Sequence, residues 1–208
     1  MIALLDYQAG NLTSVKKALA TIGAGVFVPG VPGDLADAAG IIVPGVGHFG
    51  ATRALDQAWI DAILARVGEG RPLFGICLGM QWLFEGSEEA PELAGLGLLS
   101  GRCYRLDGTS HAAPGTAQLA IKVPHVGWNS LAIQREGGLL DQVTDGSQVY
   151  FTHSYVAPVT GDMRAVTEHG EPFAAVVQRG HIGGVQFHPE KSGDVGLRIL
   201  RNFVELAG

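Results

Sequence analysis

One cysteine in this sequence stands in a context that suits a nucleophile. Cys77 follows the apolar run Pro72–Ile76, and glycines lie two positions before and after it, at Gly75 and Gly79. This is the spacing of a nucleophile elbow, a sharp strand-to-helix turn whose glycines leave room for close packing. At a helix start, the dipole and the free N–H groups favour a thiolate. We interpret Cys77 as a nucleophile, with the backbone N–H of Leu78 directed at a developing oxyanion.

The alternative for Cys77 is a buried structural cysteine, because free cysteine is among the residue types most often buried. The two glycines and the strand-to-helix context favour the nucleophile. The second cysteine, Cys103, has no such context and is expected to be a packed strand residue. Two cysteines are too few for a disulfide framework to organise the fold.

A thiol nucleophile needs a base, and the base needs a group that orients it. The candidates are His188 and Glu190, which follow the apolar run Val185–Phe187 in the segment His-Pro-Glu. Proline keeps the residue before it extended, and positions i and i+2 of extended chain face the same way. Glu190 is therefore expected to reach the imidazole of His188 and fix its tautomer. The alternatives are a strand-end histidine with a solvated glutamate, or a metal site, for which a third ligand is lacking.

A third segment has the glycines of a backbone turn. The run Ile41–Val43 leads into Pro44-Gly45-Val46-Gly47, and its strand could lie beside the Cys77 strand. The glycines permit a backbone flip that presents an N–H to the thiol, and we assign this N–H to Val46. A simple strand-ending turn is the alternative.

The elements that must position these residues alternate along the first ninety residues. Strands are predicted at residues 2–6, 26–28, 40–43 and 72–76, and helices at 12–22, 49–67 and 80–84. Asn11 is the expected cap of the first helix, and Ser192 that of a final helix. Strand, helix, strand, helix is typical of a parallel sheet with helices on its faces.

After residue 100 the pattern changes to short strands joined by turns. They are predicted at residues 102–106, 118–123, 130–133, 148–152, 164–167, 174–178 and 183–187. Residues 109–116 are rich in Gly, Pro, Ser and Ala and are expected to form an exposed loop. We therefore predict an α/β fold with a mostly parallel central sheet and an antiparallel extension.

Length and composition agree with one domain over residues 1–208. Charged residues make up only 16%, against about 25% in ordinary domains, and the 31 glycines are about twice the usual share of roughly 7%. The net charge of −6 disfavours a nucleic-acid binder. The N-terminus has no signal-peptide pattern, and no uncharged stretch approaches a transmembrane helix, so a soluble cytoplasmic protein is expected.

Taken together, these motifs resemble the class I (triad) glutamine amidotransferases over almost the whole chain. The elbow Gly75–Gly79 and the closing His188–Glu190 are shared across that superfamily. Narrower motifs occupy residues 6–12, 44–47, 80–81, 124–129, 150–155 and 186–192. These are similar to the amidotransferase subunits of imidazole glycerol phosphate synthases. The resemblance implies a flavodoxin-like core.

The resemblance also implies a glutaminase mechanism. Cys77 attacks the glutamine carboxamide and forms a thioester, His188 shuttles the proton, and Glu190 orients His188. The N–H groups of Val46 and Leu78 stabilise the tetrahedral intermediate. The residues implied to hold glutamine are Gly45, Gly47, Gln81, His153, Ser154 and Tyr155. The resemblance implies no cofactor and no metal.

The partner implied by the resemblance is a separate (β/α)₈-barrel cyclase subunit, which forms a heterodimer and receives the ammonia to make imidazole glycerol phosphate in histidine biosynthesis. The residues implied to face it are Asn11, Trp128, Tyr150 and Lys191. Ordinary core packing is the alternative for Trp128 and Tyr150.

Three further hypotheses follow from these segments. An amidotransferase chain of anthranilate synthase or of pyridoxal phosphate synthase would share the elbow, but residues 124–129 and 150–155 argue against both. A non-catalytic scaffold would keep the fold, but the intact triad argues against it. We also expect a strained backbone at Cys77, as is common at such sites.

Overall fold

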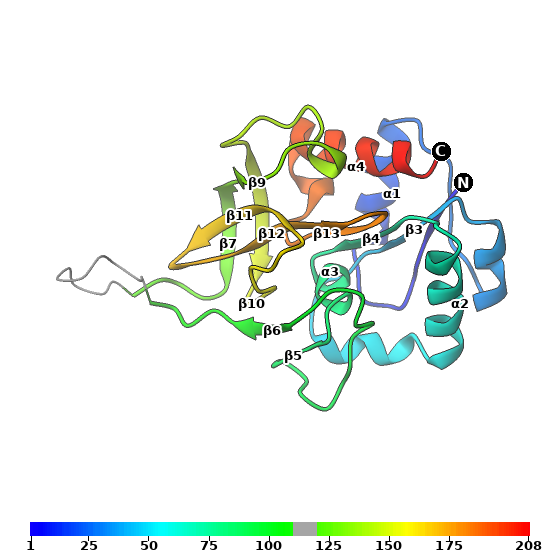
Figure 1. Ribbon diagram of the computed structural model, residues 1–208, viewed down its shortest axis with the longest axis horizontal. Coiled ribbons are helices and arrows are strands. Elements are labelled where there is room, and N and C mark those ends of the chain that lie inside the picture. Colours follow the sequence, from blue (N-terminus) through cyan, green and yellow to red (C-terminus); the bar gives the residue numbers. More distant parts are fainter. Residues whose placement is uncertain (110–119) are drawn as a thin grey trace.

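The computed structural model describes residues 1–109 and 120–208 and has an eight-stranded sheet at its centre (Figure 1). Its strand order is β2-β1-β3-β4-β13-β12-β11-β8. The parallel strands are β2 (Val26–Phe27), β1 (Ile2–Leu4), β3 (Gly40–Val43), β4 (Leu73–Ile76) and β13 (Ile182–Val185). The antiparallel strands are β12 (Glu171–Arg179), β11 (Met163–His169) and β8 (Ala132–Ile133). The predicted parallel core with an antiparallel extension is confirmed.

Helices cover both faces of the sheet. Helices α1 (Leu12–Thr21) and α4 (Gly193–Leu206) lie on one face, and α2 (Gln57–Gly68) and α3 (Leu78–Trp82) lie on the other (Figure 1). Successive strand residues point to opposite faces. Ile2 and Leu4 of β1 thus join the apolar cluster of α1 and α4, while Ala3 joins that of α2 and α3. Burial on both faces explains why these strands appear in the sequence as continuous apolar runs.

Two smaller sheets complete the layers. Strands β7 (His125–Ser130) and β9 (Gln148–His153) form an antiparallel pair, and β10 (Tyr155–Val156), β6 (Arg102–Arg105) and β5 (Gly86–Ser87) form a three-stranded sheet. Phe151 of β9 packs in the cluster of α1 and α4, and Cys103 of β6 packs in the other cluster. The segment that joins β9 to β10 lies beside Cys77 at the carboxyl edge of the parallel strands.

The prediction of one helix over residues 49–67 is wrong. Phe49–Ala54 form a 3₁₀ helix, and α2 begins only at Gln57. Leu55 leaves the helical region, with φ −90° and ψ 85°, and Asp56 accepts hydrogen bonds from two backbone N–H groups in the first turn of α2. An aspartate is a favourable N-cap, so it divides an apolar pattern that would otherwise continue.

The two predicted helix caps have different outcomes. The side chain of Asn11 accepts a hydrogen bond from the N–H of Ser14 and caps α1, as predicted. Ser192 precedes α4, but its side chain makes no cap hydrogen bond. Its hydroxyl instead donates to the carbonyl of His188 at 2.6 Å and accepts from the N–H of Tyr150 at 3.0 Å. Ser192 therefore joins the His188 turn to β9.

Some strands depart from the sequence prediction. Two predictions lie partly outside the described residues. They are the strand at 118–123, of which residues 118 and 119 are not described, and the loop at 109–116, of which only residue 109 is described. Residues 120–123 form no strand beyond an isolated bridge between Ala120 and Thr109. Strands β5, β7 and β10 were not predicted as such. In β7 the usual pattern is reversed, because Val126 and Trp128 face solvent while His125 is buried.

Candidate active site

Cys77 lies between the end of β4 and the start of α3 with φ 52° and ψ −108°. Positive φ is uncommon for a residue with a β-carbon, so the predicted backbone strain at Cys77 is confirmed. Its N–H donates to the carbonyl of Val185 in β13 at 2.8 Å, and its carbonyl accepts from the N–H of Gln81 at 3.1 Å. Leu78 is the first residue of α3, so its N–H has no helical partner and is available to a ligand.

The two elbow glycines let α3 press against the sheet. A β-carbon on Gly79 would lie 1.8 Å from the carbonyl oxygen of Val43 in β3. One on Gly75 would lie 2.5 Å from the carbonyl of Gly79. No side chain of any size fits at either position without moving backbone. The steric reason expected for the glycine spacing is therefore present.

His188 and Glu190 form a buried pair behind Cys77. Nδ1 of His188 lies 2.8 Å from Oε1 of Glu190, and both side chains are 1% exposed. His188 is extended, as expected before Pro189, but Glu190 belongs to the 3₁₀ turn Pro189–Lys191 rather than to extended chain. The expectation that Glu190 reaches the imidazole is confirmed, although the turn brings it there.

The charge state of His188 follows from these neighbours. Burial by itself lowers the pKa of His188, but the interactions with Cys77 and then with Glu190 outweigh it and raise the pKa to about 9. Its second ring nitrogen, Nε2, is buried and makes no hydrogen bond to a described residue. The raised pKa favours the imidazolium at neutral pH, and because Glu190 holds Nδ1, Nε2 is the nitrogen left for proton transfer.

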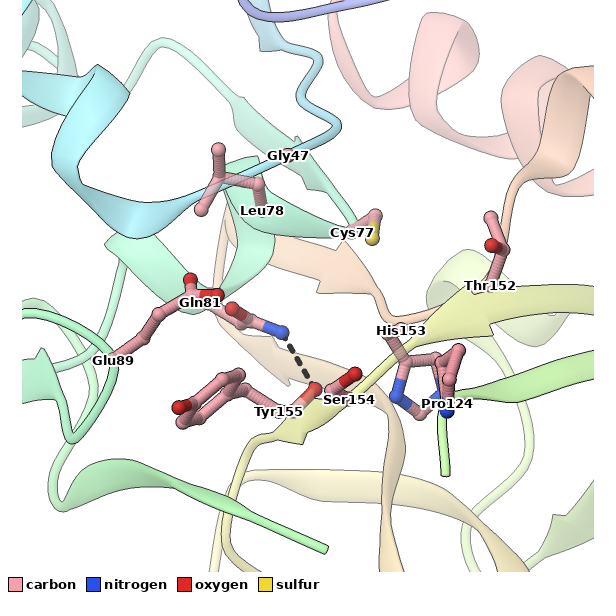
Figure 2. Close-up of a pocket in the computed structure, with 10 residues that line it drawn as sticks. All are labelled: Gly47, Cys77, Leu78, Gln81, Glu89, Pro124, Thr152, His153, Ser154 and Tyr155. Atoms are coloured by element: carbon pink, nitrogen blue, oxygen red, sulfur yellow. Dashed lines mark hydrogen bonds between the residues drawn. The ribbon is translucent and has the colours of Figure 1, made fainter. Parts of the chain in front are cut away.

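A cavity of about 210 Å³ opens beside Cys77 (Figure 2). It brings together these predicted site residues: Gly47, Cys77, Leu78, Gln81, His153, Ser154 and Tyr155. Glu89, Pro124 and Thr152 also line it and were not predicted. His188, Glu190, Gly45 and Val46 are not part of its lining. Drug-sized ligands occupy cavities of roughly 300–1,000 Å³, so this cavity suits a smaller metabolite.

Gln81 presents an acceptor to the cavity. Its Nε2 donates to the carbonyl of Tyr155 at 2.8 Å, drawn dashed in Figure 2, and to Oε1 of Gln186 at 3.1 Å. Because both hydrogens of the amide are used, its own carbonyl oxygen remains to accept a hydrogen bond from a ligand.

Glu89 places a carboxylate at the other side of the cavity from Cys77 (Figure 2). Its Oε2 accepts a hydrogen bond from the N–H of Phe49 at 2.7 Å, which holds the side chain in place. No local pattern in the sequence singled out Glu89, since the fold alone brings it to Cys77. Gln186 was also missed, although it stands two positions before His188 and so shares its face.

The glycine turn after β3 lies against the elbow, as expected. Strand β3 pairs with β4, with Val43 opposite Gly75. A β-carbon on Gly45 would lie 2.4 Å from the hydroxyl of Tyr7, which donates to the carbonyl of Pro44 at 2.6 Å. Gly45 is thus packed behind the cavity wall.

Gly47, with φ 100°, lines the cavity itself. Val46 stands between the two glycines and is half-buried.

Three histidine rings contact one another beside the cavity wall, where His125 stacks on His169 and stands edge-on to His153. The ring of His125 lies between His169, at 4.0 Å between centroids, and Phe151, at 4.7 Å. Nδ1 of His125 lies 3.2 Å from Nε2 of His153, and its Nε2 lies 3.3 Å from Nδ2 of Asn129. The Asn129 amide donates, so His125 must carry its proton on Nδ1 and donate it to His153.

Both buried histidines of this stack are neutral. Burial first, and then the neighbouring His169, lower the pKa of His125 to about 4. Burial, followed by His125, lowers the pKa of His153 well below its usual value. A neutral His153 adds no positive charge to the cavity.

This group of histidines is expected to make the fold sensitive to acid. Because the folded-state pKa of His125 is about 4 against 6.5 for the ordinary side chain, the unfolded chain binds more protons between those pH values. Stability is therefore expected to fall as pH drops from about 6.5 to about 4. His125→Gln should make the decline of Tm over this range shallower, as measured by calorimetry at stepwise pH.

The matched control is His48→Gln, which removes an exposed histidine and should leave the slope of Tm against pH unchanged. A His125→Gln protein with the wild-type slope would contradict the account of the histidine stack.

Of the four residues implied to face a partner, three lie together, namely Trp128, Tyr150 and Lys191. Trp128 is 57% exposed and its ring stands edge-on to Tyr150 at 6.1 Å. Nζ of Lys191 lies 5.7 Å above the Tyr150 ring. Core packing is therefore wrong for Trp128, while Tyr150 is half-buried. Asn11 is exposed at the start of α1.

Cys103 is buried in β6, as expected. Burial is the main cause that raises the pKa of its thiol, and Sγ lies 3.7 Å from the carbonyl oxygen of Gln81. A fully buried thiol with a raised pKa is a poor nucleophile.

Residues 1–109 and 120–208 offer neither a metal centre nor a membrane-spanning helix. They contain no group of three or more His, Cys, Asp or Glu side chains arranged to hold a metal ion. Within the same residues, no helix has the length and apolar character needed to cross a membrane.

Comparisons with known proteins agree with the motifs. Residues 3–206 match the family model described as Glutamine amidotransferase class-I. The chain is 47% identical to the imidazole glycerol phosphate synthase subunit HisH of Halobacterium salinarum, over 98% of this chain and 92% of that protein. It is 46% identical to the HisH subunit of Moorella thermoacetica, over 99% and 94%. For Methanothermobacter thermautotrophicus HisH the identity is 41%, over 99% and 98%.

Solved structures share the fold. A crystal structure of a glutamine amidotransferase has a TM-score of 0.74 at 23% identity and covers 100% of this chain and 98% of that chain. The structure of PurLQS from Thermotoga maritima has a TM-score of 0.73 at 17% identity, over 98% and 97%.

Proposed function

This chain belongs to the class I glutamine amidotransferases, and from that premise we propose that Cys77, His188 and Glu190 are its catalytic triad. It is the glutaminase subunit of an imidazole glycerol phosphate synthase, an enzyme of histidine biosynthesis. The observation that carries the triad is the strained Cys77 at the cavity, with the buried His188–Glu190 pair behind it.

The proposed reaction begins with attack of the Cys77 thiolate on the carboxamide carbon of glutamine. The carbonyl oxygen gains negative charge, and the N–H groups of Leu78 and Val46 stabilise it. The imidazolium of His188 gives its Nε2 proton to the leaving nitrogen, so ammonia departs and a thioester remains. His188, now neutral, takes a proton from water as the water attacks the thioester. Glutamate leaves, and the thiolate and imidazolium are restored.

The cavity walls suit the rest of the glutamine molecule. The Oε1 of Gln81 is placed to accept a hydrogen bond from the substrate, and Gly47 and residues 153–155 also line the cavity. Gly45 does not line the cavity, but its lack of a side chain lets the turn pack closely against Tyr7 and Leu78. We assign the Glu89 carboxylate to the α-ammonium group of glutamine, because it is the acidic side chain in the cavity lining.

Glu89→Gln is expected to raise KM for glutamine by roughly tenfold or more while kcat changes little. A hydrogen bond to a charged group contributes about 1.5–3 kcal/mol, and this one is remote from the reacting carbonyl. Steady-state kinetics of glutamate release would measure both constants. Glu88→Gln removes the neighbouring charge on an exposed residue and should leave KM unchanged. An unchanged KM in Glu89→Gln would refute the α-ammonium assignment.

The raised pKa of His188 predicts the alkaline limb of activity. The departing ammonia needs the proton of His188, which is lost as pH rises through about 9. Glu190→Gln removes a charge that holds this proton, so the pKa of His188 should fall. We expect the alkaline limb of kcat/KM near pH 9 in the wild type and at least about one unit lower in the variant.

A pH–rate profile of glutamate release would measure the shift. Glu136→Gln, at an exposed glutamate outside the cavity, should keep the wild-type profile. Superimposable profiles for the wild type and Glu190→Gln would contradict the proposed role of Glu190.

The names of the relatives indicate a subunit of a larger synthase, so a cyclase subunit is the implied partner. We propose that this partner is a (β/α)₈ barrel, that the two form a heterodimer in the cytoplasm, and that ammonia passes between them without release. The exposed Trp128, with Tyr150 edge-on to it and Lys191 above the Tyr150 ring, supports a docking face there, and Asn11 is proposed to join it.

Glutamate release from glutamine, with and without the cyclase subunit, tests this function. Formation of a one-to-one complex with that subunit and glutamate release in its presence are expected. Absence of both, with release restored by a subunit of anthranilate synthase or pyridoxal phosphate synthase, would favour those alternatives from the sequence.

A further inference from the structure

The side chain of Gln186 is fully buried beside the nucleophile. It directly follows β13, and its exposed fraction is 0%. Its Nε2 donates to Sγ of Cys77 at 3.6 Å, and its Oε1 accepts from Nε2 of Gln81 at 3.1 Å. Gln186 thus connects the proposed nucleophile with the residue that presents an acceptor to the substrate.

The neighbours of Gln186 determine which way its amide faces. The Gln81 amide nitrogen is a donor with two acceptors, so the group that meets it on Gln186 must be the oxygen. A flipped Gln186 amide would set two NH₂ groups against each other and its oxygen against the sulfur. The amide N–H is therefore directed at Cys77 whatever the charge of the thiol.

Backbone contacts hold this side chain in place. The N–H of Gln186 donates to the carbonyl of Ala175 in β12 at 2.9 Å, and the N–H of Cys77 donates to Val185 at 2.8 Å. The nucleophile and Gln186 are consequently fixed on adjacent strand ends. Gln186 and His188 both lie in the short segment that follows β13, and both interact with Cys77.

We propose that Gln186 is a further catalytic residue of the glutaminase reaction, whose N–H stabilises the Cys77 thiolate and couples its position to Gln81. A hydrogen bond to an ionised acceptor is roughly twice as strong as one between neutral groups. The N–H therefore favours the thiolate before attack, and again when water expels it from the thioester. As a neutral amide, Gln186 does this without competing with His188 for a proton. The assignment rests on the proposed function of Cys77.

Two substitutions separate the parts of this role. Gln186→Met keeps the length of the side chain and removes both hydrogen bonds. Gln186→Glu keeps an oxygen for Gln81 but replaces the N–H with a carboxylate oxygen, whose charge opposes a thiolate. Asn202→Leu is the matched control, because Asn202 is also a buried amide with two hydrogen bonds, to the carbonyls of Leu139 and Asp141.

The first measurement is the rate at which iodoacetamide alkylates Cys77 in the purified full chain. We expect Gln186→Met to react about tenfold more slowly than the wild type at pH 7, which corresponds to about 1.4 kcal/mol of lost thiolate stabilisation. Gln186→Glu should also react more slowly than the wild type, because the charge of the new carboxylate opposes a thiolate on Cys77. Asn202→Leu should react at the wild-type rate.

The second measurement is glutamate release in the presence of the cyclase subunit. We expect kcat to fall about tenfold or more in both Gln186 variants, with KM within about twofold in Gln186→Glu, since the acceptor for Gln81 remains. Wild-type alkylation rates and kcat in folded variants would overturn the proposal. If Gln186→Met does not fold, Gln186→Glu alone decides. A wild-type chain without glutaminase activity would instead refute the proposed function. The alkylation rates would still test Gln186, because they do not depend on glutaminase activity.

Discussion

Replacing Cys77 with serine is expected to lower glutamate release from glutamine by at least about a thousandfold, because the serine hydroxyl is a far weaker nucleophile beside an imidazolium than a thiolate is. The same complex should still make imidazole glycerol phosphate when ammonium salt replaces glutamine. Ammonia enters after the step that Cys77 performs, so only the glutamine-dependent reaction depends on the thiol. Both rates are measured on the reconstituted pair of subunits.

The other cysteine supplies the control for this substitution. Cys103→Ala removes a buried thiol that is not part of the cavity lining, and its glutaminase rate should stay within about twofold of the wild type. A Cys77→Ser enzyme that released glutamate at the wild-type rate would show that the nucleophile lies elsewhere.

The second large effect is structural. Gly79→Ala is expected to destabilise the chain by about 3 kcal/mol or more, since the new β-carbon would lie 1.8 Å from the carbonyl oxygen of Val43. Backbone, not a flexible side chain, stands in the way, so β3 and α3 must separate. A chain of this size loses roughly 2–4 °C of Tm per kcal/mol. Tm should therefore fall by about 6 °C or more, and glutaminase activity should be lost as the elbow moves.

Gly68→Ala is the matched control, because a β-carbon at Gly68 in α2 meets nothing within 4 Å. Alanine there should leave stability unchanged or raise it by up to about 1 kcal/mol. Thermal unfolding followed by circular dichroism compares the two variants. Equal Tm values for Gly79→Ala and the wild type would contradict the packing role of the elbow glycines.

The parts of the site that sequence could predict are those set by local stereochemistry. The Cys77 elbow depends on glycines two residues away, and the His188–Glu190 contact spans two residues, so each pattern lies within one short segment. Parallel pairing of β3 with β4 followed from the strand and helix order.

The remaining site residues depend on distant parts of the chain. Glu89 reaches the cavity because the chain after α3 folds back through β5, and its carboxylate is held by Phe49, 40 residues away. No periodicity in the sequence reports such a contact. Gln186 contacts Gln81, 105 residues away, although its position two residues before His188 was a usable signal.

Sequence prediction also failed where a side chain had two competing roles. Asp56 lies within an apolar helical pattern but serves as a cap, which splits the helix predicted over residues 49–67. Ser192 is of a residue type that often caps helices, and it directly precedes α4, but its hydroxyl instead forms hydrogen bonds with the backbone of His188 and Tyr150. Tertiary contacts decide between such roles. For Ser192, these contacts hold in place the turn that begins at His188, the proposed catalytic base.

The most direct test of the central claim follows the amide nitrogen of glutamine. The wild-type chain and the cyclase subunit are supplied with the cyclase's nucleotide substrate, glutamine labelled with ¹⁵N in the amide, and an excess of unlabelled ammonium ion. We expect the imidazole ring of the product to carry the ¹⁵N label, and Cys77→Ser to abolish this incorporation. Product nitrogen drawn only from the unlabelled ammonium pool, with no glutamate released, would contradict that claim.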